Sequence, residues 1–373
     1  MSIRIESWGA RGLQNIAGPW RELLARSNAD PLFNSPEWLS TWWAHYQPVL
    51  GAELEILAAV DDHRLVGLAL LHAKSVKHKL GLEGRRVELL GTAWRAQGVG
   101  FSERLGFILE RGREEQVAAA LADRLLDDHS WLDLVASHVH RGGATDLALQ
   151  HMAESSGGYL RTPDAMEAWE IPLVGSFEDL LASLGAGTRA RIMASRKRLS
   201  KAGHWQERVL GPDELDHGWE VFSKLHEERW NRPFSAHWRG FYGAIAEMQA
   251  APGTPVLSLL EFEGEPVSLL VNFRAGGREY SIASAFVPVN VKRVSPGWMH
   301  LGLAIERAFA DGMTHFDLLA GEGKQEQYKA AFGGRRYELA CLQLVRHRPL
   351  AWLYRSWDGF SELRRRLSRL AER

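Results

Sequence analysis

The chain has 373 residues, of which 45% are hydrophobic and 24% charged, so it is long enough to bury more than one core. Its formal net charge of −1 excludes a molecule that binds polyanions through overall charge, and any basic function must come from local clusters. Its single cysteine, Cys341, excludes an internal disulfide and suits a reducing compartment.

Neither a signal sequence nor a membrane span is expected. The first residues lack an apolar run of signal-peptide length, and no stretch of about 18 apolar residues occurs. We therefore expect a cytoplasmic protein that at most rests peripherally on the inner face of the membrane. The fifteen histidines show none of the spacings of metal ligands, so the sequence predicts no metal.

The chain repeats one pattern of elements. Residues 54–73 and residues 255–274 each read as an apolar run, a polar turn and a second apolar run, which predicts two β-hairpins. The second hairpin continues into a strand at 278–286. In each half a helix pattern then leads to a strand, which carries Asp133 in the first half and Asp317 in the second. The sequence therefore predicts a tandem repeat of one α/β unit.

A basic segment, "LGAGTRARIMASRKRLSKAGH", lies between the halves. Thr188 can cap a helix that Gly203 ends. Six basic residues, among them Arg189 and Arg196, follow one another with no acid between them. Two interpretations stay open. One is a solvated linker helix with a basic face, and the other is a helix whose basic residues contact the phosphate of a coenzyme, a nucleotide or an anionic head group.

A helix start with the properties of an anion site is expected after the strand at 278–286. Ser295 stands at the N-cap position, and the first turn would leave the backbone N–H groups of Gly297, Trp298 and Met299 unpaired. The positive end of the helix dipole and the nearby Arg293 would favour a phosphate there. A Ser-Pro-Gly sequence also begins ordinary helices, so that interpretation remains beside it.

Polar residues follow the last strand of the second half, in "FDLLAGEGKQEQYKAAFGG". Asp317 lies in the strand, Glu322 follows it, and Tyr328 and Lys329 begin a helix. In α/β sheets such positions face ligands held at a neighbouring helix start. Adjacent helical residues point about 100° apart, so at most one of the Tyr–Lys pair faces a cleft squarely. A structural hydrogen bond is the alternative role for Asp317.

The order and spacing of these elements resemble the GNAT acyltransferase fold. More specifically, the chain resembles tandem-GNAT proteins of the BioF2-like and CelD/BcsL type, relatives of the FemAB peptidoglycan aminoacyl ligases. The likeness is carried by "LFNSPEWLSTWWAHY", "RARIMASRKRLSKAG", "RVSPGWMHLGLAIERAFADG" and "FDLLAGEGKQEQYKAAFGG". It implies an α/β (α+β) fold of two tandem GNAT-like domains, each a central mixed β-sheet flanked by helices.

Four segments follow from this resemblance. We expect an N-terminal GNAT-like domain at 1–175, a basic linker helix at 176–205, a catalytic C-terminal GNAT domain at 206–348 and an amphipathic basic tail helix at 349–373.

The resemblance also implies an activity. It predicts an N-acyltransferase that uses acetyl-CoA or a longer acyl-CoA and acts on an amine of a cell-envelope, lipid or exopolysaccharide-related acceptor, with no DNA partner. The donor pyrophosphate would rest on the helix start at 295–299 beside Arg293, and Arg229 and Trp230 would wall the acceptor pocket. An ordinary amphipathic helix is the alternative for the latter pair. Two alternatives for the whole chain stay open, which are a FemAB-type transferase using aminoacyl-tRNA and a non-catalytic accessory protein of polysaccharide assembly.

Acyl transfer to an amine requires a base for the amine, a donor for the oxyanion and a proton for the leaving group. We predict Tyr328 as the proton donor and Lys329 as the positive charge facing the oxyanion or a substrate phosphate. Asp317 and Glu322 are the predicted candidate bases.

The tail combines an apolar stripe with arginines. The stripe has spacings of three or four and consists of Leu350, Leu353, Trp357, Phe360, Leu363, Leu367 and Leu370. Such a pattern is typical of a helix at a membrane interface and also of a helix docked on the protein's own surface. Both interpretations stay open.

Overall fold

A computed structural model describes residues 3–78, 81–100, 102–247, 253–321 and 327–371. The strands are β1 (Arg4–Ser7), β2 (Glu53–Asp61), β3 (Arg64–Lys77), β4 (Glu83–Leu89), β5 (Ile108–Leu109), β6 (Trp131–His140), β7 (Tyr159–Pro172), β8 (Trp205–Val209), β9 (Thr254–Phe262), β10 (Glu265–Ala275), β11 (Arg278–Phe286), β12 (His315–Ala320) and β13 (Arg335–Val345).

The α-helices are α1 (Leu13–Ala25), α2 (Pro36–Leu50), α3 (Glu114–Asp127), α4 (Ala144–Ser156), α5 (Phe177–Ser183), α6 (Ala186–Arg189), α7 (Ser195–Ala202), α8 (Leu215–Trp230), α9 (Ala236–Glu247), α10 (Pro296–Ala310), α11 (Gln327–Ala331) and α12 (Arg348–Ala371). Short turns are the 3-10 segments η1 (Gly9–Arg11) and η4 (Pro212–Glu214) and the π-helical segment η3 (Ala190–Ala194).

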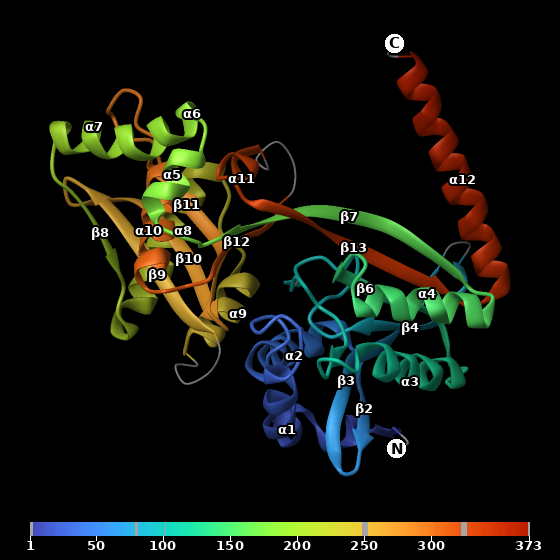
Figure 1. The fold of residues 1–373 in the computed structure, drawn as a ribbon. Coiled ribbons are helices and arrows are strands. Elements are labelled where there is room, and N and C mark those ends of the chain that lie inside the picture. The colour runs from blue at the N-terminus through green and yellow to red at the C-terminus, as the bar shows by residue number, and fades with distance from the viewer. Residues whose placement is uncertain (1–2, 79–80, 101, 248–252, 322–326, 372–373) are drawn as a thin grey trace.

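The predicted repeat is present in the sheet. Both hairpins are confirmed, because β2 pairs with β3 and β9 with β10, each antiparallel. In each half a parallel pair follows at the same place, β4 with β6 and β11 with β12, with a helix between the two strands of the pair. The predicted mixed sheet flanked by helices is therefore confirmed (Figure 1).

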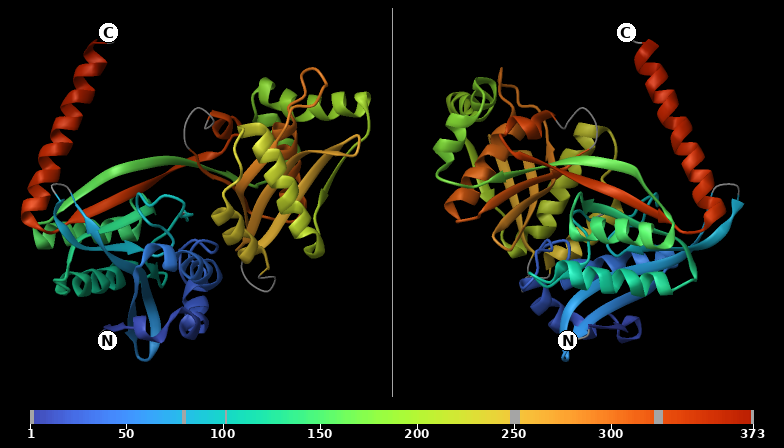
Figure 2. Two further views of the ribbon diagram at one scale, coloured as in Figure 1. Left: turned by 180° about the vertical axis from the view of Figure 1, so that it is seen from behind. Right: turned by 45° about the vertical axis from the view of Figure 1, so that its right-hand side comes forward.

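The sheets of the two halves are joined into one. The strand order is β1-β2-β3-β4-β6-β13-β7-β12-β11-β10-β9-β8, with β5 beside β3. The join is made by β7 and β13, which pair along most of their length and run as a long ribbon between the halves (Figures 1 and 2). Because β13 comes from the second half of the sequence and pairs with β6 of the first, the chain returns to the first half near its end. The two halves therefore share main-chain hydrogen bonds.

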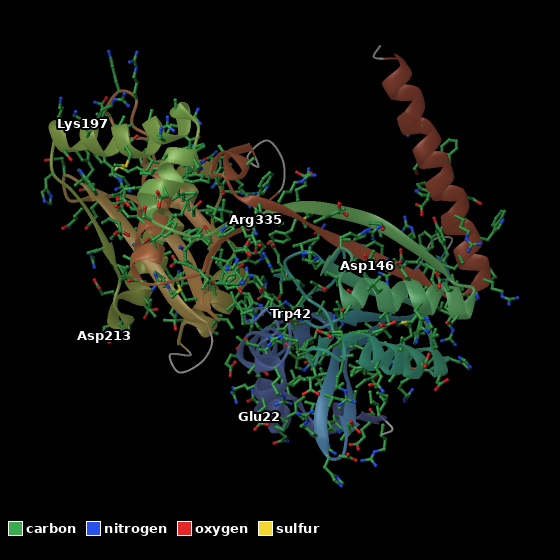
Figure 3. All side chains as sticks on the ribbon, viewed as in Figure 1. Glu22, Trp42, Asp146, Lys197, Asp213 and Arg335 are labelled. Atoms are coloured by element: carbon green, nitrogen blue, oxygen red, sulfur yellow. The ribbon has the colours of Figure 1, made fainter. Side chains whose placement is uncertain are left out.

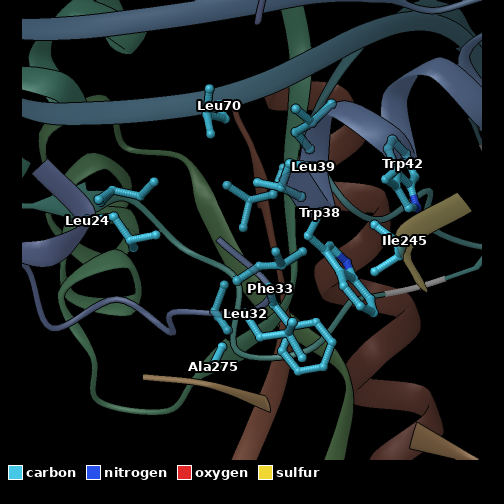
Figure 4. Packing of buried hydrophobic residues seen from close by; sticks show 14 of the residues in the cluster. Leu24, Leu32, Phe33, Trp38, Leu39, Trp42, Leu70, Ile245 and Ala275 are labelled. Atoms are coloured by element: carbon cyan, nitrogen blue, oxygen red, sulfur yellow. The ribbon is translucent and has the colours of Figure 1, made fainter. Parts of the chain in front are cut away.

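The apolar core is also shared. Trp38 of α2 is fully buried and meets three rings edge-on, those of Phe33 at 5.0 Å, Phe241 of α9 at 5.1 Å and Phe273 of β10 at 5.8 Å. Figure 4 shows Phe33 and Trp38 from the first half beside Ile245 and Ala275 from the second. Edge-to-face contacts add stability beyond the area that they bury, so this cluster fixes how the halves meet.

Two predictions about helices need comment. The basic helix ends at Gly203 as predicted, but Thr188 does not cap it. The helix begins one turn earlier, at Ala186 after Gly185, so Thr188 lies inside its first turn and is buried. The tail is helical as predicted over α12, and Figure 2 shows it standing away from the body. Within the described ranges, no helix is long and apolar enough to cross a membrane.

The shared core leads to a prediction about unfolding. Tyr280 of β11 donates a buried hydrogen bond (3.0 Å) to Asp30 of the first half. Tyr280→Phe keeps the ring but leaves that carboxylate oxygen without this donor, which we expect to cost about 1–3 kcal/mol. Urea unfolding followed by fluorescence and by circular dichroism should give one shifted transition. Two separate transitions, with only one of them shifted, would show that the halves unfold independently.

Candidate active site

A cavity lies where two neighbouring strands of the second half separate. The parallel strands β11 and β12 pair only from Arg278–His315 to Tyr280–Asp317. Beyond that point lies a cavity of about 170 Å³. Its lining comes from both halves and consists of Phe33, Glu103, Trp238, Tyr242, Ser281, Ile282, Ala283, Ser284, Leu318, Leu319, Ala320, Tyr328 and Lys329. Where strands part, their backbone groups are available to bond a ligand.

Lys329 holds the end of β12. Its buried Nζ donates to the carbonyl oxygens of Leu319 at 2.9 Å and of Ala320 at 2.7 Å. Leu319 has a positive φ of 59°, and the pairing of β12 with β7 shifts register between Asp317 and Leu319. The lysine thus stabilises an irregular strand end that points its carbonyl groups at the cation. Lys329 is also among the residues that line the cavity.

Glu103 comes from the first half and was not predicted. The backbone N–H of Ala320 donates to its Oε2 at 2.8 Å, and the residue is 5% exposed. Burial raises the pKa of this carboxyl to about 7, with Asp317 adding to the rise, while the Ala320 N–H and the charges of Lys329 and Arg104 act against it. A carboxyl that titrates near neutral pH inside a cavity has the properties of a general base.

Arg104, the next residue, fixes this loop to the second half. Its Nη2 lies 2.6 Å from Oδ2 of Asp317 and donates to Glu170 at 2.8 Å, while its Nε donates to the Tyr337 hydroxyl at 3.0 Å. That hydroxyl in turn donates to Oδ1 of Asp317 at 3.0 Å. Asp317 is therefore engaged by Arg104 and Tyr337 and lies behind the cavity lining. Of the two roles weighed for Asp317, the contacts favour the structural one.

Tyr328 lines the cavity from α11. It packs edge-on against Trp298 of α10 at 6.1 Å, and Trp298 stacks on Phe332 at 5.1 Å. Burial raises the pKa of Tyr328, and the charge of Arg229 partly offsets this, so the phenol keeps its proton at neutral pH. Tyr328 and Lys329 both line the cavity, whereas the sequence analysis expected at most one of the two to face it squarely.

The start of α10 has the predicted N-cap, Ser295, although its side chain makes no capping bond. The N–H of Met299 is not free, because it donates to the Ser295 carbonyl at 3.0 Å. No acceptor is recorded among the described residues for the N–H groups of Gly297 and Trp298. A Cβ on Gly297 would lie 2.5 Å from the Phe286 ring, so this glycine is required by packing.

Basic side chains of the linker segment lie near this helix start. Arg191 lies over the Trp298 ring at 4.7 Å, and Arg198 donates to the Arg293 carbonyl at 2.9 Å. Figure 3 shows Lys197 on α7, the helix that also contains Arg198. The predicted Arg189 instead bonds the Ala182 and Leu184 carbonyls.

Arg196 makes an ion pair with Glu306 at 2.6 Å, which turns it away from the helix start. Arg229 lies 3.4 Å over the ring of Phe286 and 4.9 Å over that of Trp230, and neither of these predicted acceptor-wall residues is among those that line the smaller cavity. The fourth catalytic candidate, Glu322, lies outside the described residues.

A larger groove of about 1030 Å³ lies in the first half between α3 and α4. It contains none of the predicted residues. Arg104 and Arg278 at its edge already bond Glu170, at 2.8 Å each. The smaller cavity is the candidate active site because a buried carboxyl, a phenol and an ammonium meet there. Among the described residues, no three or more His, Cys, Asp or Glu side chains gather as metal ligands would.

Comparison with known proteins gives one family match. Residues 186–330, less than half of the chain, match a family described as the acetyltransferase (GNAT) domain, which supports a transferase. The matched segment contains every lining residue that the second half contributes to the cavity. A search of curated proteins finds no match.

Three solved structures share the fold over most of their length. The first is FemX, with a TM-score of 0.62, 14% identity, and coverage of 90% of this chain and 98% of that one. The second, from Agrobacterium fabrum, is described as the C-terminal domain of a lysylphosphatidylglycerol synthetase (TM-score 0.51, 7% identity, 92% and 95% covered). The third is L-PGS from Bacillus licheniformis (TM-score 0.51, 11% identity, 88% and 91% covered). At these identities the similarity shows the fold alone.

The pKa of Glu103 gives a prediction about stability. The folded state holds this proton up to about pH 7, whereas the ordinary value is 4.5. The protonated Glu103 carboxyl therefore stabilises the folded state fully below about pH 4.5, and this stabilisation is lost as pH rises through about 7. Glu103→Gln lacks this dependence on pH. The free energy of unfolding of the wild type minus that of the variant should therefore fall by about 2 kcal/mol between pH 5 and 8.

Urea unfolding at four pH values measures this difference, and the buried histidines cancel because both proteins carry them. A difference that stays constant across the range would show that Glu103 titrates normally.

Proposed function

We propose that the chain transfers an acyl group from a thioester donor to an amine in the cavity between β11 and β12. The observation that carries the proposal is the meeting of Glu103, Tyr328 and Lys329 in one cavity of the matched domain. The acyl group would lie in the gap between the strands, and the amine would approach from the side of Glu103.

In this scheme the amine nitrogen attacks the thioester carbonyl carbon. The carboxylate of Glu103 takes the proton that the nitrogen loses. The tetrahedral oxyanion then collapses, the carbon–sulfur bond breaks, and Tyr328 gives its proton to the leaving sulfur. The products are an amide and a free thiol, and solvent returns the proton from Glu103 to Tyr328. No cofactor other than the donor is needed for this balance.

Lys329 has an electrostatic and positioning role in the proposal. Its ammonium keeps the end of β12 in place through two carbonyl contacts. Its charge acts against the rise in the pKa of Glu103 and so increases the fraction of carboxylate at neutral pH. The same charge stabilises an oxyanion that forms nearby, because electrostatic interactions are strong in a buried site.

For the donor we propose acetyl-CoA or a longer acyl-CoA. A polyanionic donor would find the N–H groups of Gly297 and Trp298, the helix dipole of α10 and the cations Arg191, Arg198 and Arg293 in one region. An aminoacyl-tRNA is the second candidate donor, because the fold is shared with FemX. Both donors present phosphates, so this region alone does not choose between them.

The size of the cavity bears on the acceptor. About 170 Å³ admits an acyl carbonyl and an amine with a short linker, well below the 300–1,000 Å³ of pockets that enclose whole ligands. We therefore propose an acceptor whose amine enters while its bulk stays outside, as with an amine on a cell-envelope, lipid or exopolysaccharide-related molecule. Such an acceptor places the enzyme on the cytoplasmic side of the membrane.

The two proton carriers should have separable effects on the pH profile. Wild-type kcat/KM should rise with pH through about 7, since the carboxylate of Glu103 is the active form. Glu103→Gln should remove this rise and lower the rate about 100- to 10,000-fold. Tyr328→Phe should keep the rise but lower kcat by a similar factor, with donor affinity nearly unchanged.

Tyr354→Phe, at a buried tyrosine of α12, is the matched control and should behave as wild type. Single-turnover transfer at saturating donor measures these rates. A Glu103→Gln enzyme with a full rate and an unchanged profile would remove Glu103 from the mechanism.

The donor can be identified by thermal stabilisation. A ligand that binds only the folded state raises Tm, and the rise grows with the ratio of the ligand concentration to Kd. We expect acyl-CoA to stabilise wild type, and Arg191→Gln with Arg293→Gln to weaken that binding about tenfold or more at low salt. Lys224→Gln, an exposed cation on α8, is the control and should change nothing.

Stabilisation by charged tRNA and not by any CoA ester would favour the second donor. Stabilisation by neither, with no turnover, would fit the accessory protein and would contradict the proposal.

A further inference from the structure

Three large apolar side chains of α12 are exposed to solvent and lie outside the candidate active site. Trp352 is 70% exposed, Trp357 56% and Phe360 68%. Isolated exposed apolar residues are common, but three aromatic rings on one helix form a patch of the kind that marks an interaction surface. We call these three residues the aromatic face of α12.

The base of α12 is firmly attached to the body. Leu350 and Tyr354 are buried against the end of β13. The carboxylate of Asp358 accepts two hydrogen bonds from Arg161 of β7, both at 2.6 Å, and one from the Tyr159 hydroxyl at 3.1 Å. The first three turns are thus fixed in orientation, and the aromatic face is held outward.

The aromatic face and the attached face differ in direction. At about 100° per residue, Trp352, Trp357 and Phe360 fall within an arc of about 140°, and Tyr354 and Asp358 lie outside it. Leu353, which is partly buried against the attached base, falls inside the same arc. The apolar stripe predicted for the tail therefore divides along the helix, with Leu350 and Leu353 packed on the body and Trp357 and Phe360 exposed farther along.

The charge of the segment indicates what the aromatic face contacts. Residues 348–373 contain seven arginines and three acidic residues, and one of the acids, Asp358, is already paired with Arg161. Two copies of such a helix would repel each other, whereas a surface of negative charge would attract it. Tryptophan and phenylalanine together with arginine are the residues that place helices at the boundary between lipid headgroups and acyl chains.

We propose that α12 binds the surface of an anionic lipid bilayer. The aromatic face enters the boundary between headgroups and acyl chains, and the arginines face lipid phosphates. Binding at the interface needs no transmembrane span. Figures 1 and 2 show α12 on the first half, away from the strands β11 and β12 that form the candidate active site. The helix therefore acts as a tether and does not close over the cavity.

The proposal is tested with the full chain and with vesicles of phosphatidylcholine containing phosphatidylglycerol. Wild type should sediment with these vesicles, and less so with pure phosphatidylcholine or at high salt. The triple variant Trp352→Ser, Trp357→Ser and Phe360→Ser should lower the binding constant about tenfold or more. The control triple variant is Val49→Ser, Leu147→Ser and Val174→Ser, which removes equally exposed apolar residues elsewhere and should bind as wild type.

Unchanged melting temperatures establish that both triple variants are folded. Transfer to a small soluble amine should be the same in all three proteins, so loss of tethering and loss of catalysis are told apart. Equal sedimentation of wild type and the aromatic-face variant would overturn the proposal. So would a concentration-dependent dimer that the same variant abolishes, with no vesicle binding, because the face would then contact a second copy of the chain.

Discussion

The guanidinium of Arg104 is the contact on which the geometry of the candidate site depends. It comes from the first half and reaches Glu170 on β7, Asp317 on β12 and Tyr337 on β13, the three strands where the two halves join. A buried charge is costly unless it is paired, and here Arg104 and Arg278 are matched by two carboxylates. Because these positive and negative charges are paired, the loop that carries Arg104 is held in one position relative to β12. Glu103, one residue earlier, is thereby held against the Ala320 N–H.

Neither half contains the site alone. The second half provides the separated strands, the phenol and the ammonium, and the first half provides the carboxyl and part of the wall. The strands β7 and β13 keep the two halves together, because separating the halves would break the pairing of β13 with β6 and with β7. The first half contains a corresponding contact at Asp133. The Asp133 carboxylate accepts hydrogen bonds from the guanidinium of Arg86 and the amide of Gln343, so in both repeats the strand aspartate neutralises a buried arginine.

Local patterns in the sequence predicted the hairpins, the helix and strand that follow each of them, and the start of α10, because periodicity and capping residues are read within one element. Glu103 could not be found in this way, since its partner Ala320 lies 217 residues away. Its signal is weak: an acid beside an arginine in a glycine-rich, otherwise apolar loop. The contacts of the arginines in the basic helix could not be predicted for another reason. The π-helical segment η3 changes the helical register, so regular spacing from Arg189 does not show which side chains face α10.

Aromatic packing connects the start of α10 to the cavity. The Phe286 ring fills the space that the missing side chain of Gly297 leaves, and Arg229 lies on the same ring. On the other side, Trp298 lies between the guanidinium of Arg191 and the ring of Tyr328. An anion that draws Arg191 toward the helix start therefore acts on a side chain in contact with the proposed proton donor. Packed rings transmit small displacements because the interior has little free volume. In this arrangement the glycine, the tryptophan and the basic helix are needed together, since each sets the position of the next side chain toward the cavity.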